Sequence, residues 1–273
     1  MELSLPAKTT TQTGEQYSLG KILGIWALAA LPIGILSGIV FPVLSPDYRV
    51  DPLGAGVIRL LLLTVGLIWL FVLSLLIVRQ EEGDLRWATI QRRLRLNAPY
   101  DPKTGETRSR LWLWVIPFVI AVALLDVGLR PAIIKLWVAL FPFLAEPPGY
   151  SMDAVFKSQA VLDRLVGAWW FLGLYVVNAL FNTLLGEELL FRGVLLPKMV
   201  GVFGRWRWVA NGVLFGCYHL HQPWGIAASI IAGVFLYALP SWHFRSTWLG
   251  SIVHSMQSVY FALLILGVVL GLA

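Results

Sequence analysis

Two adjacent carboxylates and an arginine stand inside a strongly apolar stretch of this chain, in GEELLFRG at residues 186–193. Glu188 and Arg192 are four positions apart with the acid first, the favourable order for an ion pair on one helix face. Glu187 lies about 100° around the helix from Glu188, so we expect it to stay outside that pair. A carboxylate that lacks a cation partner in an apolar environment can serve as a general base or acid. The spacing therefore separates a structural carboxylate, Glu188, from a reactive one, Glu187.

Two histidines form further pairs at the same helical spacing. Phe215 and His219 share one helix face, and His254 shares a face with Ser258. A single buried histidine is more often a hydrogen-bonded core residue than a catalyst. Together with the glutamate pair, however, His219 and His254 favour a functional site, because ionisable residues within membrane segments are costly and usually functional.

The remaining candidates for chemistry are interpreted as structural. His221 lies beside a predicted turn, and His243 lies at a predicted interface. Cys217 is the single cysteine and points away from His219 on a helix, which makes it a poor nucleophile. The sequence also has no GxGD pair of aspartates and no GxSxG serine context, so these two protease chemistries fit poorly.

The composition indicates the kind of structure that carries these candidate residues. Of the 273 residues, 58% are hydrophobic and only 13% are charged, and the mean hydropathy is +0.75. Soluble domains are usually about 25% charged. The sequence therefore predicts an all-α, polytopic membrane helix bundle, formed as a single integral-membrane domain over residues 1–273.

Long uncharged runs mark the predicted spans, since a helix needs about 20 apolar residues to cross a bilayer. One run is long enough for two helices joined at residues 221–225, and a shorter piece that holds Lys135 is interpreted as interfacial or re-entrant. These runs predict seven spans, or eight, with Trp208–Trp242 counted as two and Pro131–Ala145 as the interfacial piece. The runs are Ile22–Pro46, Leu60–Val78, Leu111–Leu129, Leu165–Gly186, Trp208–Trp242 and Ser246–Ala273.

Basic residues predict the orientation. With the N-terminus in the cytoplasm, fifteen Lys and Arg side chains fall inside and six fall outside. The net charge of +6 is therefore attributed to membrane orientation, and no nucleic-acid partner is expected. Residues 85–96 mix apolar and basic side chains and predict an interfacial helix that anchors the cytoplasmic loop. The short tails favour a bacterial cell membrane as the location.

The polar residues, in this order, resemble the motif series of the CPBP family, which comprises type II CAAX prenyl endopeptidases and bacteriocin-processing and self-immunity proteins. The resemblance covers the motif-bearing half of the chain, residues 165–260, and rests on three motifs: Glu187-Glu188-x-x-x-Arg192, Phe215-x-x-x-His219 and His254-x-x-x-Ser258. The chain departs from the family at Ser258, where members usually have asparagine, and in helix number, which is usually eight.

The resemblance implies a division of labour within the site. Glu187 and His219 would activate a water for peptide hydrolysis, while His254 and Ser258 would polarise the scissile carbonyl and stabilise the oxyanion. We favour a mechanism without a cofactor, although the family has also been called metalloproteases. A zinc alternative would use Glu187, His219 and His254 as ligands, although the sequence has no HExxH helix.

Three functions remain open at this stage. The first is an intramembrane endopeptidase that cuts a membrane-associated peptide or protein. The second is a catalytically inactive member of the same fold, acting as an immunity, assembly or scaffold partner of other membrane proteins, and Ser258 makes this alternative more credible. The third is a small proton-coupled transporter, which the lack of an internal repeat disfavours.

Overall fold

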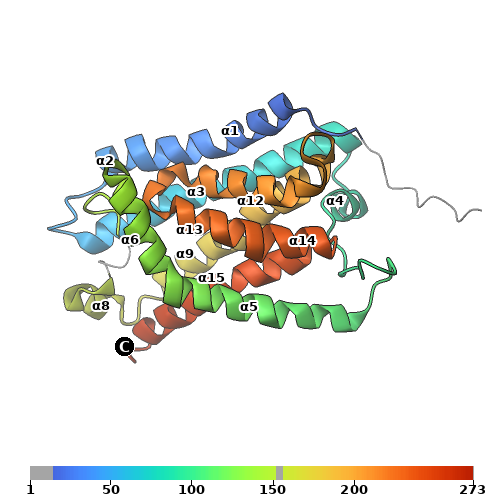
Figure 1. Cartoon of the computed structure of the whole chain (residues 1–273). Coiled ribbons are helices and arrows are strands. Elements are labelled where there is room, and N and C mark those ends of the chain that lie inside the picture. Colours follow the sequence, from blue (N-terminus) through green and yellow to red (C-terminus); the bar gives the residue numbers. More distant parts are fainter. Residues whose placement is uncertain (1–14, 152–155, 273) are drawn as a thin grey trace, which may run out of the picture.

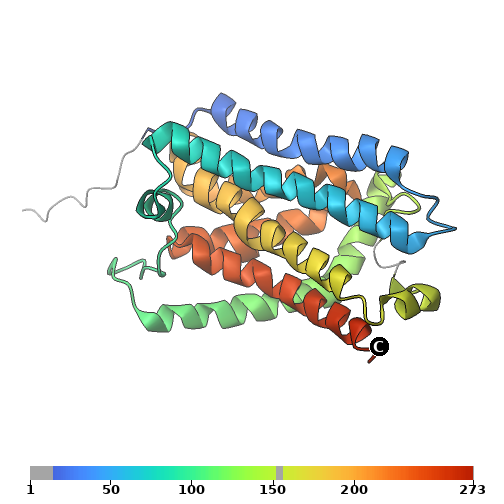
Figure 2. The ribbon, with the colours of Figure 1, turned by 180° about the vertical axis from the view of Figure 1, so that it is seen from behind.

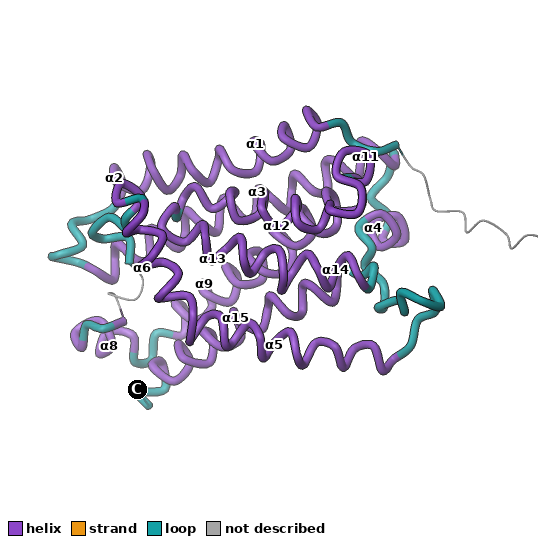
Figure 3. The backbone as a smooth tube through the Cα atoms, in the orientation of Figure 1, coloured by secondary structure: helices purple, strands orange, loops and turns teal. Residues whose placement is uncertain are grey.

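The fold is a bundle of helices in a computed structural model that describes residues 15–151 and 156–272 (Figures 1 and 3). Within these residues, six helices are long and apolar enough to cross a membrane, and the extended structure is limited to one isolated bridge between Tyr100 and Thr107. The predicted all-α polytopic bundle is confirmed, and the protein is an integral membrane protein. The predicted count of seven or eight spans is not confirmed.

The first half of the described chain contains three long helices. The first comprises α1 (Leu19–Ile35), a π turn and α2 (Phe41–Leu44), and the second is α3 (Pro52–Glu82). The short α4 (Trp87–Arg93) follows. The third runs without interruption over Ser109–Leu140 and includes α5 (Val115–Ala123) and α6 (Arg130–Leu140).

The second half begins with α8 (Gln159–Leu165) and a long helix over Trp169–Lys198, which includes α9 (Trp169–Leu180) and α10 (Leu196–Lys198). Then follow α11 (Val200–Phe203) and α12 (Arg207–Tyr218), which lead into a tight turn. The last helices are α13 (Ile226–Ile231), α14 (Leu239–His243) and α15 (Thr247–Val269).

The predicted separate interfacial piece over Pro131–Ala145 is wrong, because α6 continues the helix that contains α5. A π turn over Leu124–Leu129 joins the two, and α6 leaves the direction of α5 there (Figure 1). Such turns are a recognised cause of helix kinks. Arg130 is accommodated at the kink because its guanidinium lies 2.6 Å from the Asp126 carboxylate.

The predicted pair of helices within Trp208–Trp242 is present, and its joint lies at His219–Gly225 as expected. The first helix of the pair, α12, has only 12 residues and is too short to count as a span. The second continues from the turn through α13 and α14. This short helix is the main reason for the lower count of spans.

The helix that carries the glutamate pair differs from its predicted bounds at both ends. It begins at Trp169 rather than Leu165, after a break at Gly167, whose φ of +73° is left-handed. It then continues to Lys198, eleven residues beyond Glu187. Glu187 is therefore near the middle of the bundle, at the depth where α12 ends in His219.

Close packing around this helix depends on glycine. A Cβ atom added to Gly186 would lie 2.7 Å from the carbonyl oxygen of Leu67 on α3, so only glycine permits this approach. Figure 2 shows the Trp169–Lys198 helix between α3 and α15, and it packs against both. The glutamate pair is thus enclosed by helices from both halves of the chain.

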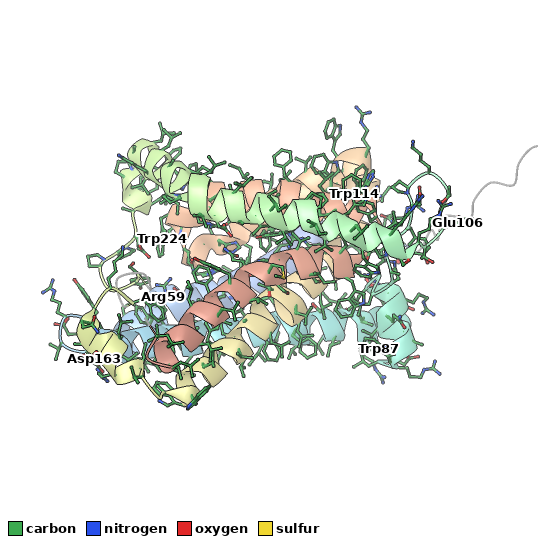
Figure 4. All side chains as sticks on the ribbon, turned by 90° about the horizontal axis from the view of Figure 1, so that it is seen from below. Arg59, Trp87, Glu106, Trp114, Asp163 and Trp224 are labelled. Atoms are coloured by element: carbon green, nitrogen blue, oxygen red, sulfur yellow. The ribbon has the colours of Figure 1, made fainter. Side chains whose placement is uncertain are left out.

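The two ends of the bundle carry different residues. Figure 4 places Trp87, Glu106 and Trp114 at one end, which we call the Trp87 end, and Arg59, Asp163 and Trp224 toward the other, the Asp163 end. The segments predicted to face the cytoplasm meet at the Trp87 end, namely α4, the start of α12 and the end of α14 (Figure 1).

Candidate active site

The two glutamates are buried between two π-helical segments of one helix. Glu187 is 2% exposed and Glu188 is fully buried. The segments Phe181–Gly186 and Leu189–Leu195 flank them on either side. π turns are rare and frequently mark functional sites, because they leave carbonyl groups free and redirect side chains. Here they direct two consecutive carboxylates to different partners.

Glu188 lies at the centre of a fully buried polar cluster. Its Oε1 is 3.0 Å from Nη1 of Arg192 and 2.9 Å from Nδ1 of His254. The Arg192 guanidinium stacks at 4.1 Å over the ring of Phe215, and its Nη2 lies 3.5 Å from the Gly233 carbonyl oxygen. The pair expected from the i,i+4 spacing is therefore present, and it includes a histidine as a third member.

The ring of His254 is fixed from two sides. Its Nδ1 contacts Glu188, and its face stacks on Tyr237 with the ring centres 4.1 Å apart and nearly parallel. Because the Glu188 carboxylate is held by Arg192, it accepts the hydrogen bond and Nδ1 donates it. The second nitrogen, Nε2, is left for another partner.

Glu187 faces His219 across a short gap. His219 Nδ1 is 2.9 Å from the Phe215 carbonyl oxygen, which can only accept, so Nδ1 carries the proton. The lone pair of Nε2 is then directed to Glu187, whose Oε1 is 4.0 Å away. That separation is too long for a direct hydrogen bond and is suited to one water that contacts both groups.

Two further side chains orient Glu187. Asn182 lies 3.2 and 3.3 Å from the two carboxylate oxygens in the orientation in which its amide nitrogen donates. The hydroxyl of Tyr218 lies beside the same carboxylate without a well-aligned hydrogen bond. Sequence reasoning missed both residues. Asn182 was detectable in principle, as a polar side chain five residues before Glu187 in an apolar run.

One cavity of about 660 Å³ brings the candidate residues together. Its wall includes Glu187, His219, His254 and Ser258. Ser258 is 7% exposed; its carbonyl accepts from the Tyr175 hydroxyl at 3.3 Å, and its own hydroxyl has no hydrogen-bond partner among the described residues. Much of the remaining wall is apolar and reaches toward the Asp163 end: Leu60, Phe156, Leu162, Phe171, Ile265 and Val268.

The two other histidines lie in different places. His221 lines the same cavity, 8% exposed, and its Nδ1 has no hydrogen-bond partner in the described chain. Its carbonyl accepts from Ser37 at 3.3 Å, which ties the turn to the first helix. His243 lies at the end of α14 and packs against Phe244, away from the cavity. Of the two, His221 is therefore the one that could contact a bound substrate.

Comparison with known proteins adds one finding. Residues 167–260 match the family model of Rce1-like proteins, described as type II CAAX prenyl endopeptidase Rce1-like. This chain carries an Rce1-like domain. The predicted resemblance to the CPBP family is thereby confirmed over these residues of the membrane protein. Neither the curated proteins nor the solved structures provided a match.

The Rce1-like domain contains all four predicted catalytic residues but depends on a residue outside it. Arg93 of α4 is 7% exposed, and its guanidinium lies 3.2 Å from the carbonyl oxygen of Gly193 and 3.4 Å from that of Val194. Both carbonyls belong to the π-helical segment after the glutamates. Glu81 balances the charge at 2.8 Å. The loop that we interpreted as an anchor therefore also clamps the helix of the site.

Within residues 15–151 and 156–272, no three side chains of His, Cys, Asp or Glu are close enough together to hold a metal ion. Both histidines engage Nδ1 and leave Nε2 free, which is also the usual arrangement of a zinc-binding histidine, so the zinc alternative with Glu187, His219 and His254 stays a prediction.

Proposed function

We propose that this protein is an intramembrane endopeptidase that hydrolyses a peptide bond in a membrane-associated substrate. The observation that carries the proposal is the convergence of Glu187, His219, His254 and Ser258 on one cavity inside a bundle of membrane helices. Polar groups at this depth must meet one another or water. The match to a family of CAAX-type endopeptidases supports the same reaction class.

The water that attacks would lie between Glu187 and His219. A water in the 4.0 Å gap donates one hydrogen bond to the Glu187 carboxylate and another to the lone pair of His219 Nε2. As the water oxygen bonds to the carbonyl carbon, its proton passes to Glu187. The carbonyl becomes a tetrahedral oxyanion, and the same proton then goes to the nitrogen of the leaving peptide.

The oxyanion would be held by His254 and Ser258. Preorganised donors in a water-poor site stabilise such a charge more strongly than they would in water. The Ser258 hydroxyl is free to donate. His254 already uses its Nδ1 proton on Glu188, so it can donate to the oxyanion only when Nε2 is protonated as well.

The surroundings of the site support a lipid-associated substrate. The long apolar wall of the cavity suits a hydrophobic peptide or a prenylated one. We propose a location in a bacterial cell membrane with the N-terminus in the cytoplasm, as the distribution of basic residues indicates. A membrane-protein partner is the alternative to a substrate for the same cavity.

The test is peptide hydrolysis by purified protein in lipid vesicles. We expect cleavage of a membrane-anchored peptide, detected by mass spectrometry, to continue after chelation and with less than one metal ion per chain. Ser258→Asn should cleave at a similar or higher rate. If wild type is inert toward every peptide and Ser258→Asn gains activity, the inactive-member alternative replaces the enzyme. Stoichiometric zinc that is lost together with activity would establish a metal mechanism.

Replacing His254 should change both the rate and its pH dependence. If Glu187 acts as the general base and His254 must carry both protons, the rate of hydrolysis should follow a bell-shaped curve against pH. The rate should rise as Glu187 ionises and fall as His254 loses its second proton. His254→Ala should lower turnover by about 10²–10³-fold. His254→Gln retains an N–H donor at every pH, so we expect partial activity without the alkaline decline. An unchanged decline in His254→Gln would assign it to another group.

A further inference from the structure

Three arginines from three different segments lie at the Trp87 end of the bundle. Arg95 follows α4, Arg207 begins α12 and Arg245 follows α14. The Arg207 guanidinium lies over the ring of Trp242, three residues before Arg245, and the charges of Arg207 and Arg245 act on Arg95. Like charges repel, so the chain must hold them together against that repulsion.

Backbone hydrogen bonds join the two loops that carry Arg95 and Arg245. The amide of Thr247 donates to the Arg95 carbonyl at 3.0 Å, and the side chain of Asn97 donates to the Arg245 carbonyl at 3.0 Å. Ser246 adds a hydrogen bond of 2.6 Å to the carbonyl of Asn97. These hydrogen bonds hold together two loops that are almost 150 residues apart in the sequence. One loop carries Arg95 and the other carries Arg245.

Both of these arginines have a strained backbone. Arg95 has a φ of +52° and Arg245 a φ of +49°, and in residues 15–151 and 156–272 they are the two non-glycine residues with positive φ. This region is unfavourable for side chains with a Cβ, and residues kept there often serve a function. Glycine would fit both positions without strain, yet both carry a guanidinium.

Other arginines at the Trp87 end form ion pairs with carboxylates. Arg86 pairs with Asp84 at 2.8 Å and Arg108 with Glu106 at 2.8 Å, and Arg92 is paired as well. In the part of the chain that the structure describes, no carboxylate pairs with Arg95, Arg207 or Arg245. The Nε of Arg207 is buried without a hydrogen-bond partner.

The electrostatics of Arg95 indicate an unbalanced positive field. Burial, together with the charges of Arg207, Arg245 and Arg93, lowers the pKa of Arg95 to about 10. Trp208 and Trp242 stack with their ring centres 5.9 Å apart, and Arg207 of the cluster lies over Trp242 at 5.9 Å. Tryptophan is enriched at the depth of lipid headgroups. The cluster therefore lies where phosphate groups are abundant.

We propose that Arg95, Arg207 and Arg245 form a binding site for an anionic phosphate group at the membrane surface. Guanidinium groups match phosphate oxygens with paired hydrogen bonds, and three of them around one phosphate convert mutual repulsion into attraction. The headgroup of an anionic phospholipid and a soluble phosphate share this chemistry. The site is separate from the cavity and does not depend on the proposed peptidase activity.

A general orientation signal does not account for these features. Basic residues that orient a membrane protein need only lie on one side of the bilayer. They need neither a left-handed backbone nor hydrogen bonds that bring two distant loops together. The ion-paired arginines at the same end fulfil the orientation role and provide a matched control for the cluster.

The test uses the full-length protein purified in a neutral detergent. Isothermal titration calorimetry would measure binding of three probes: short-chain phosphatidylglycerol, short-chain phosphatidylcholine and inorganic phosphate. We expect phosphatidylglycerol to bind the wild type in preference to phosphatidylcholine. The double variant Arg207→Gln/Arg245→Gln should bind it roughly 25-fold more weakly, at about fivefold per arginine. The control Arg86→Gln/Arg92→Gln removes the same charge and should change affinity by less than about twofold, because salt screens distant charges.

Arg95→Gly separates binding from folding. Glycine relieves the positive φ, so the melting temperature without lipid should stay equal or rise, while affinity for phosphatidylglycerol falls about fivefold. Binding of inorganic phosphate with the same dependence on the three arginines would support the site and identify a soluble phosphate as its ligand. Equal losses in the two double variants, or no binding of either anion, would overturn the proposal.

Discussion

Glu187→Gln should lower peptide hydrolysis by about 10²–10⁴-fold, the usual contribution of a general base. The amide has the shape of the carboxylate but cannot accept the proton of the attacking water. Among the described residues Glu187 makes no ion pair with an arginine, so its replacement leaves the buried Glu188–Arg192 pair intact. The melting curve in detergent should therefore remain close to that of wild type. Hydrolysis and melting would be measured on the same preparation.

The control for this variant is Glu82→Gln, which removes a carboxylate that pairs with Arg92 at the surface. Surface ion pairs contribute little, so both rate and stability should stay near wild type. If Glu187→Gln kept most of its hydrolysis, Glu187 would not be the base. If it instead melted early with partial activity, Glu187 would be the structural member of the glutamate pair.

Glu188→Gln should destabilise the protein by about 3–5 kcal/mol, because it leaves a buried guanidinium without its counter-charge. Arg192 is 1% exposed, and Phe215 covers its face at 4.1 Å, so water cannot replace the lost carboxylate. His254 also loses its partner at 2.9 Å. The expected result is a large drop in melting temperature together with loss of activity.

A second substitution separates charge from packing. Glu188→Gln combined with Arg192→Met removes both charges and fills the space with an apolar side chain. Replacing a buried ion pair in this way is often neutral or stabilising, so the double variant should recover most of the lost stability. It should stay inactive, since His254 loses the carboxylate that stabilises its doubly protonated form. A Glu188→Gln protein as stable as wild type would show that Glu188 does not hold the fold.

Periodicity and composition were sufficient to predict the class of fold and the Glu188–Arg192 pair, whereas the grouping of Glu187, His219, His254 and Ser258 was implied by the family resemblance. The i,i+4 spacing of Glu188 and Arg192 predicts one helix face, and their atoms lie 3.0 Å apart. The apolar runs predict the helices because a bilayer requires length and hydrophobicity in each span. The catalytic roles of Glu187, His219, His254 and Ser258 remain predictions.

Features set by tertiary packing were not predictable in this way. The π turns around Glu187 and at Leu124–Leu129 have no pattern in hydrophobic spacing, although the second one forms the kink before α6. The role of Arg93 was missed for a similar reason. Its basic, surface-like segment looks like a membrane anchor in sequence, while its partners are backbone carbonyls a hundred residues away.

The clamp by Arg93 has a consequence for biosynthesis. Tyr17 donates its hydroxyl to Glu81, accepts from Arg93 at 2.9 Å, and its amide donates to the Lys198 carbonyl at 3.0 Å. Tyr17, Glu81 and Arg93 leave the ribosome well before the helix that they hold. The later helices can thus assemble onto a surface that already exists. Residues 167–260 expressed alone would lack these partners, so the family match marks ancestry in sequence rather than a separable folding unit.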